Sequence, residues 1–148
     1  MTRIRRILYA SDFSPASRPA FARAVALAKT DRAALTIVHV MIPVVPLVGY
    51  GYVSPALERD LTRRARAQAI KRIGALVAKA KTAGARATSL VLEGAPADRI
   101  VRAARARRAD LIVMGTHGRG AMAKLFLGSV AGRVIATSLC PVLTVRGR

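Results

Sequence analysis

The sequence predicts an α/β protein built on a doubly wound parallel sheet, and three features of the chain predict it. Short apolar segments alternate with segments of helical spacing from one end of the chain to the other. These short segments are continuous apolar runs, which is typical of strands covered by helices on both faces. A chain of 148 residues with 53% hydrophobic content is also large enough for one core, so we expect a single domain over residues 1–148.

The first half of the chain contains two predicted strands and two predicted helices. Ile7–Ala10 is an apolar run that ends at turn-forming residues, and it predicts the first strand. The helix that follows has one apolar face, formed by Phe21, Ala24, Val25 and Ala28. Because a proline inside a helix removes a needed donor, Pro19 favours a start near Ser17. Ala34–Val40 predicts the second strand, and Met41–Val53 an unusually apolar loop.

A long helix is expected to begin after Ser54, where serine is a good cap and Pro55 suits the first turn. Its predicted buried stripe consists of Leu57, Leu61, Ala65, Ala69, Ile73, Leu76 and Ala80.

The second half continues the alternation of strand and helix. The predicted strands are Ala87–Glu93, Leu111–Met114 and Pro141–Val145, and the predicted helices are Pro96–Ala106 and Ser129–Ser138. In sheets of this kind, ligands bind beyond the carboxyl ends of the strands at the point where strand order reverses. A ligand site is therefore expected in the loops that follow the strands.

Composition limits the class of protein and its partners. The single Cys140 excludes an internal disulfide, and no uncharged stretch is long and apolar enough for a membrane span, so we expect a cytoplasmic protein with no membrane partner. The 26 Lys and Arg against 7 Asp and Glu give a net charge of +19, which attracts polyanions. The basic residues are spread along the sequence, and aromatic residues for stacking are few. A solvated surface is therefore favoured, and we expect no specific nucleic-acid partner.

A glycine-rich loop at 115–128 is the strongest chemical signal. Glycines let backbone N–H groups approach a phosphate, and the helix that begins at Ser129 adds unpaired donors. Arg119 and Lys124 are placed to neutralise phosphate charge, although either could be an ordinary surface cation. A lone glycine-rich loop is more often a plain connection, and neither the P-loop nor the dinucleotide fingerprint is present.

The spacing of the glycines raises the odds of a nucleotide site. Gly115, two residues, Gly118, nine residues and then Gly128-Ser129 resembles the nucleotide-binding signature of the universal stress protein family. The resemblance extends from Ile7–Ser17 at the start of the chain to Cys140–Arg146 at its end.

The resemblance implies a five-stranded parallel sheet in the order 3-2-1-4-5 that binds ATP, with Mg or Mn arriving on the nucleotide. The positions that match the family's nucleotide contacts are Ala10, Asp12, Val40, Gly115, Gly118, Gly128, Ser129 and Val130. Among these, Asp12 would lie near the ribose and the metal, Ala10 would line the adenine pocket, and the backbone of Val40 would bond to adenine. Ala131 stands where some ATP-binding members have a hydroxyl residue.

The family order also places the last strand at a sheet edge, so we expect a homodimer that pairs through this strand. The favoured function is an ATP-binding stress-response or signalling module with little or no hydrolysis, because the loop lacks a dedicated base and a P-loop lysine. An ATP-using enzyme would need more carboxylates at the site. The alternative function is a basic protein that associates with nucleic acid through its charge.

Overall fold

Five parallel strands form one sheet in the order β3-β2-β1-β4-β5, as the resemblance implied. The computed structural model describes residues 3–43, 53–117 and 127–147. The strands are β1 (Arg6–Ala10), β2 (Ala34–Met41), β3 (Arg86–Glu93), β4 (Leu111–Gly115) and β5 (Val142–Val145). Every neighbouring pair is parallel. The predicted class, a doubly wound α/β domain, is confirmed.

The helices fill the connections between these strands. They are α1 (Arg18–Asp31), α2 (Pro55–Thr82), α3 (Pro96–Ala106) and α4 (Ser129–Thr137), preceded by a short 3-10 turn η1 (Pro15–Ser17). Ser17 is the N-cap of α1, so Pro19 falls in the first turn, where its missing donor is tolerated. None of the helices in the described ranges is long and apolar enough to cross a membrane.

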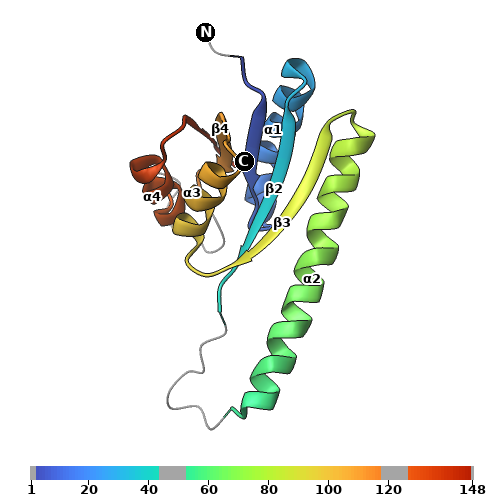
Figure 1. The fold of residues 1–148 in the computed structure, drawn as a ribbon, viewed down its shortest axis with the longest axis vertical. Helices are drawn as coiled ribbons and strands as arrows, with labels where there is room; N and C mark the ends of the chain where they lie inside the picture. The colour runs from blue at the N-terminus through green and yellow to red at the C-terminus, as the bar shows by residue number, and fades with distance from the viewer. Residues whose placement is uncertain (1–2, 44–52, 118–126, 148) are drawn as a thin grey trace.

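Helices cover both faces of the sheet, which explains why the strands are continuous apolar runs (Figure 1). Ile7 and Tyr9 of β1 face one layer, where they pack with α1 and α2, while Leu8 faces the other layer with α3 and α4. All three side chains are buried, because successive residues of a strand point to opposite faces.

The predicted stripe of α2 is buried only in its C-terminal half. Ala69, Ile73 and Ala80 are buried, whereas Leu57 and Leu61 are 48% and 42% exposed. The reason is length: a helix of 28 residues extends about 42 Å, but a strand of eight residues spans only about 27 Å. The first turns of α2 therefore project past the sheet (Figure 1), and the expectation that Leu57, Leu61 and Ala65 are buried is wrong.

Candidate functional site

A cavity of about 550 Å³ opens at the carboxyl ends of β1, β2 and β4, where the strand order reverses. It is lined by seven of the residues selected from the sequence, namely Ala10, Asp12, Val40, Gly115, Gly128, Ser129 and Val130. Gly118, Arg119 and Lys124 lie outside the described residues. The fold thus brings together residues from four separate segments, and their role toward a nucleotide stays a prediction.

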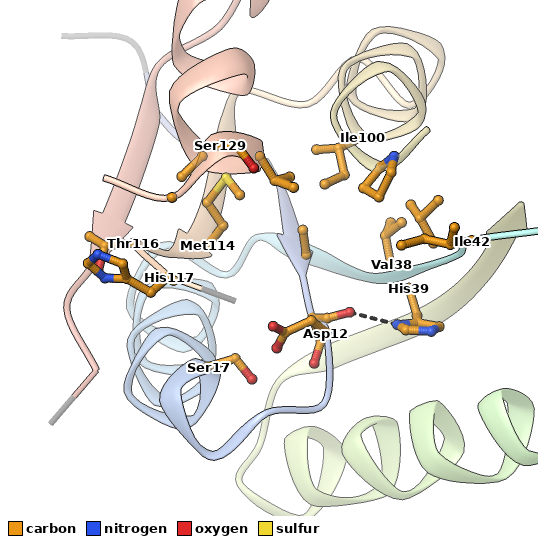
Figure 2. Close-up of a pocket in the computed structure, with 18 of the residues that line it drawn as sticks. Asp12, Ser17, Val38, His39, Ile42, Ile100, Met114, Thr116, His117 and Ser129 are labelled. Atoms are coloured by element: carbon orange, nitrogen blue, oxygen red, sulfur yellow. Dashed lines mark hydrogen bonds between the residues drawn. The ribbon is translucent and has the colours of Figure 1, made fainter. Parts of the chain in front are cut away.

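The two sides of the cavity differ in chemistry (Figure 2). Val38, Ile42 and Ile100 form an apolar side. Thr116, His117 and Ser129 lie opposite, on the side where β4 ends and α4 begins. This arrangement suits a ligand with an apolar ring at one end and a polar or charged group at the other.

Asp12 is held at the floor of the cavity by a tight turn after β1. Its Oδ1 accepts hydrogen bonds from the backbone N–H of Ser14 (2.9 Å) and from the Ser14 hydroxyl (2.6 Å). Its Oδ2 is buried and has no hydrogen-bond partner among the described residues. Asp12 does not cap α1, because the N-cap of this helix is Ser17. An unpaired buried carboxylate oxygen is costly, which favours a donor supplied by a ligand.

The residue after Asp12 is locked by a stack that reaches to α2. Phe13 has a φ of 63°, a left-handed conformation that costs a non-glycine residue about 1–2 kcal/mol. The Phe13 ring stacks on the His39 ring with centroids 4.2 Å apart. The Arg72 guanidinium lies over the Phe13 ring, 4.5 Å from its centroid. Arg72 also donates to the Phe13 carbonyl oxygen at 3.3 Å. These contacts stabilise the turn that presents Asp12.

A second anchor lies beneath the same turn. The buried Tyr9 hydroxyl donates to the Ser17 carbonyl oxygen at 3.1 Å. Burial raises the pKa of Tyr9, so the phenol keeps its proton and remains a donor at neutral pH. In Figure 2, the dashed line marks the bond from His39 Nδ1 to the Ser11 carbonyl oxygen (2.8 Å), which ties β2 to the start of the turn.

The hydrogen-bond pattern of β2 directs the backbone of Val40 toward the cavity. The Val38 carbonyl accepts from Ser11 after β1, whereas the Met41 carbonyl accepts from Gly94 after β3. Because backbone groups along a strand alternate between its two neighbours, the N–H and C=O of Val40 point to the β1 side. The strand β1 ends at Ala10, opposite Val38, so Val40 faces the space beyond it.

The N-terminus of α4 supplies backbone donors at the opposite side. Gly128 is the N-cap and has no side-chain cap, and the first intrahelical bond runs from Gly132 to Gly128. The N–H groups of Ser129, Val130 and Ala131 therefore have no partner within the helix. Such a helix start attracts anions through these donors and through its dipole.

His117 also lines the cavity, although its position in a loop of the sequence gives no sign of its orientation. Its Nδ1 lies 2.9 Å from the Thr116 hydroxyl, and its Nε2 is buried without a partner among the described residues. The cavity also contains Ser17, Pro96 and Ile100, which come from helix starts and not from the motif. Only the tertiary fold brings these residues to the site.

Comparison with known proteins agrees with this fold and site. Residues 3–146 match the model of the Universal stress protein family. A Thermus aquaticus relative, the universal stress protein in QAH/OAS sulfhydrylase 3'region, is 42% identical over 142 residues that cover 96% of this chain and 98% of the relative. The class of protein is a doubly wound α/β domain with a switch-point pocket. The chain belongs to the universal stress protein family.

Solved structures give the same result. The universal stress protein UspA from Lactobacillus plantarum superimposes with a TM-score of 0.81 at 27% identity, covering 99% of this chain and all of the other. A universal stress protein solved in complex with cAMP has a TM-score of 0.71 at 29% identity, covering 98% of both chains.

Proposed function

We propose that the protein binds ATP in the switch-point cavity and acts as a stress-response or signalling module. The observation that carries the proposal is a pair of buried polar atoms, Asp12 Oδ2 and His117 Nε2, that have no hydrogen-bond partner among the described residues and belong to one cavity of about 550 Å³. A ligand with hydroxyl and phosphate groups would satisfy both atoms. The cAMP complex of a 29% identical neighbour supports the choice of an adenine nucleotide.

The two sides of the cavity suit the two ends of ATP. The adenine ring would lie against Ala10 and the apolar side, where the backbone N–H and C=O of Val40 match the acceptor and donor at the edge of the base. The phosphates would lie at the N-terminus of α4, near Gly128, Ser129 and Val130, where Gly115 also lines the cavity.

A divalent metal, Mg or Mn, would come with the nucleotide. Within the described ranges no group of three or more His, Cys, Asp or Glu residues could hold a metal by itself. Asp12 is the one carboxylate that lines the described part of the cavity, and a carboxylate beside phosphate oxygens is a ligand set that Mg²⁺ prefers. Asp12 would thus hold the metal only when nucleotide is present.

Binding without efficient turnover is the favoured behaviour. The sequence has no P-loop lysine, and a single carboxylate at the site leaves no second acid to position an attacking water. Occupancy of the pocket would then act through dimer shape or partner choice.

The free edge of β5 supports a homodimer. The N–H groups of Ile112 and Thr116 donate to the carbonyls of Pro141 and Val145. The backbone groups of Pro141 and Val145 therefore face β4, and those of the alternate residues Val142 and Thr144 face away from it. In the described sheet β5 pairs only with β4, which leaves one edge open for a second copy.

Calorimetric titration with Mg-ATP tests the nucleotide proposal. Asp12→Asn keeps an oxygen for the Ser14 bonds but removes the charge, so affinity should fall roughly 10- to 100-fold, as expected for losing a hydrogen bond to a charged group. Glu93→Gln is the matched control, because Glu93 ends β3 at the same edge of the sheet without lining the cavity. Absence of ATP binding to the wild type, or equal loss in both variants, would contradict the proposal.

A further inference from the structure

The loops at the amino ends of the strands gather basic residues that are far apart in the sequence. We call this surface the amino edge, and it lies at the top of Figure 1, where β1 begins and α1 and α2 end. Its cations are Arg3, Arg5, Arg6, Lys29, Arg32, Lys81, Arg86, Arg105, Arg107 and Arg108, and every one is exposed. At least two of them stand before or at the start of each of β1, β2, β3 and β4.

The acidic residues lie mostly at the other end of the sheet. Only Asp31 and Asp110 belong to the amino edge, whereas Asp12, Glu58, Asp60, Glu93 and Asp98 lie in or beside the loops at the carboxyl ends. The fold therefore separates a strongly basic edge from the predicted nucleotide cavity. The arginines are spread along the sequence, so the sequence alone does not show that basic residues are concentrated at this edge.

Part of this charge has a structural role, but most of its donors remain available. Arg6 Nε donates to the Arg108 carbonyl (2.6 Å), and Arg86 donates to the Arg32 carbonyl (2.6 Å). Each guanidinium has five N–H groups in a planar fork, so one internal bond leaves others for a phosphate. Arg5, Arg105 and Arg107 are exposed, and each extends from a loop or the last turn of a helix.

Asp110 holds the middle of the amino edge together. One of its oxygens accepts the backbone N–H groups of Arg5 and Arg6, each at 2.8 Å. The Arg5 N–H bond is the main reason why the pKa of Asp110 is lowered. A carboxylate engaged in this way joins the starts of β1 and β4 and aligns their cations side by side.

We propose that the amino edge binds the sugar–phosphate backbone of double-stranded nucleic acid without sequence preference. Strands lie about 4.8 Å apart, so the loops before β3, β2, β1 and β4 span about 15 Å. A DNA duplex carries one charge per about 1.7 Å of axis, or roughly nine charges over that length. The ten cations of the amino edge match this charge density.

The composition of the amino edge favours a duplex over a lipid surface. Eight of the ten cations are arginines, whose planar forks bind phosphates with two bonds. Stable attachment to a membrane needs an apolar anchor as well as basic charge. Within the described ranges the large, exposed hydrophobic residues near the amino edge are Leu139 and, in the last turn of α4, Ile135. No described aromatic side chain is exposed there for base stacking, so sequence would not be read.

A charge-matched pair of variants tests the proposal on the full chain. The edge variant carries Arg5→Gln, Lys81→Gln, Arg105→Gln and Arg107→Gln, none of which removes a side-chain bond of the described residues. The control variant carries Arg23→Gln, Arg59→Gln, Arg66→Gln and Arg102→Gln, four exposed cations on helix surfaces. Both lower the net charge from +19 to +15, so long-range attraction is equal and only position differs. Both should melt within a few degrees of the wild type, because all eight positions are exposed.

Binding to several unrelated 20-base-pair duplexes is measured by fluorescence anisotropy across a salt series. The wild type should bind every duplex alike, with a Kd of about 10⁻⁴–10⁻⁶ M at physiological salt. Each lost phosphate contact lowers the slope of log affinity against log salt by about 0.9. If all four cations of the edge variant contact phosphates, its slope should fall by about 3.6, whereas the slope of the control variant should fall by less than about 1.

Three outcomes would overturn the proposal. The first is an equal loss in both variants, which would indicate bulk charge alone. The second is an edge variant that loses binding to phosphatidylserine vesicles but binds DNA like the wild type, which would assign the amino edge to membranes. The third is displacement of DNA by saturating ATP, which would place the duplex at the cavity on the opposite end of the sheet. Independent binding of ATP and DNA is expected, and DNA binding does not depend on the nucleotide proposal.

Discussion

Replacing Gly128 by alanine should destabilise the protein, because a Cβ at this position has no room. The added atom would lie 2.9 Å from the carbonyl oxygen of Thr116 and 3.4 Å from the Cα of His117. The same carbonyl accepts the Gly128 N–H at 2.7 Å, so it cannot move away without weakening that bond. Gly128 has φ −60° and ψ 153°, which any residue adopts, so the cost comes from the contact and not from the backbone conformation.

The size of the effect follows from these two terms. Overpacking against a fixed neighbour costs typically about 1–3 kcal/mol, and weakening one hydrogen bond costs about 0.5–1.5 kcal/mol. We expect the free energy of unfolding to fall by about 2 kcal/mol. Gly132→Ala is the matched control in the same helix, because among the described residues its Cβ would meet only a Leu127 methyl at 3.7 Å. Alanine inside a helix should raise stability by about 0.5–1 kcal/mol.

Urea unfolding followed by far-UV circular dichroism measures both variants. ATP titration at a temperature where both remain folded shows in addition whether movement of the α4 start weakens binding, which we expect for Gly128→Ala only. If Gly128→Ala unfolded at the same urea concentration as the wild type, or if both glycine variants shifted in the same direction, the contact at Thr116 would not have the cost inferred from the structure.

Three further perturbations probe the pocket turn, the sheet edge and the amino edge. Arg72→Met removes the guanidinium that lies over the Phe13 ring in the turn after β1. It should lower the free energy of unfolding in urea by about 0.5–1 kcal/mol and weaken ATP binding in calorimetry. Lys71→Met, at an exposed neighbouring position, should have neither effect. Val142→Pro removes an N–H that faces away from β4. Light scattering should therefore give a monomer mass, while the circular dichroism spectrum stays unchanged. A variant that remained dimeric would exclude pairing through β5. The pKa of Asp110 is lowered in the folded state, chiefly by the N–H of Arg5, so its contribution to stability is complete above its ordinary pKa near 3.9 and is lost as pH falls through the folded value. Asp110→Asn should therefore be less stable than the wild type near pH 7, and the difference should shrink as the pH falls below the ordinary pKa of the carboxyl. A difference that was constant with pH would contradict this role.

Local sequence patterns determined where the strands and helices lie along the chain and which of their faces are apolar. The apolar run Ile7–Ala10 predicted β1, and the cap and proline at Ser54 and Pro55 predicted the start of α2. Apolar runs without alternation predicted that both faces of the sheet are covered, as the two core layers confirm. All seven described residues selected for a nucleotide site line one cavity, because their loops follow strands whose carboxyl ends share an edge.

Only the tertiary structure decided which distant residues meet. His117 lines the cavity with its Nε2 buried because β4 ends beside α4, and no local pattern sets that orientation. Leu57 and Leu61 look like core residues by spacing, yet they lie past the end of a shorter sheet. The basic residues of the amino edge converge because every crossover returns the chain to the same end of the sheet. Backbone preferences act over a few residues, whereas crossovers bring together positions that are tens of residues apart, so the elements could be predicted from the sequence and the charged edge could not.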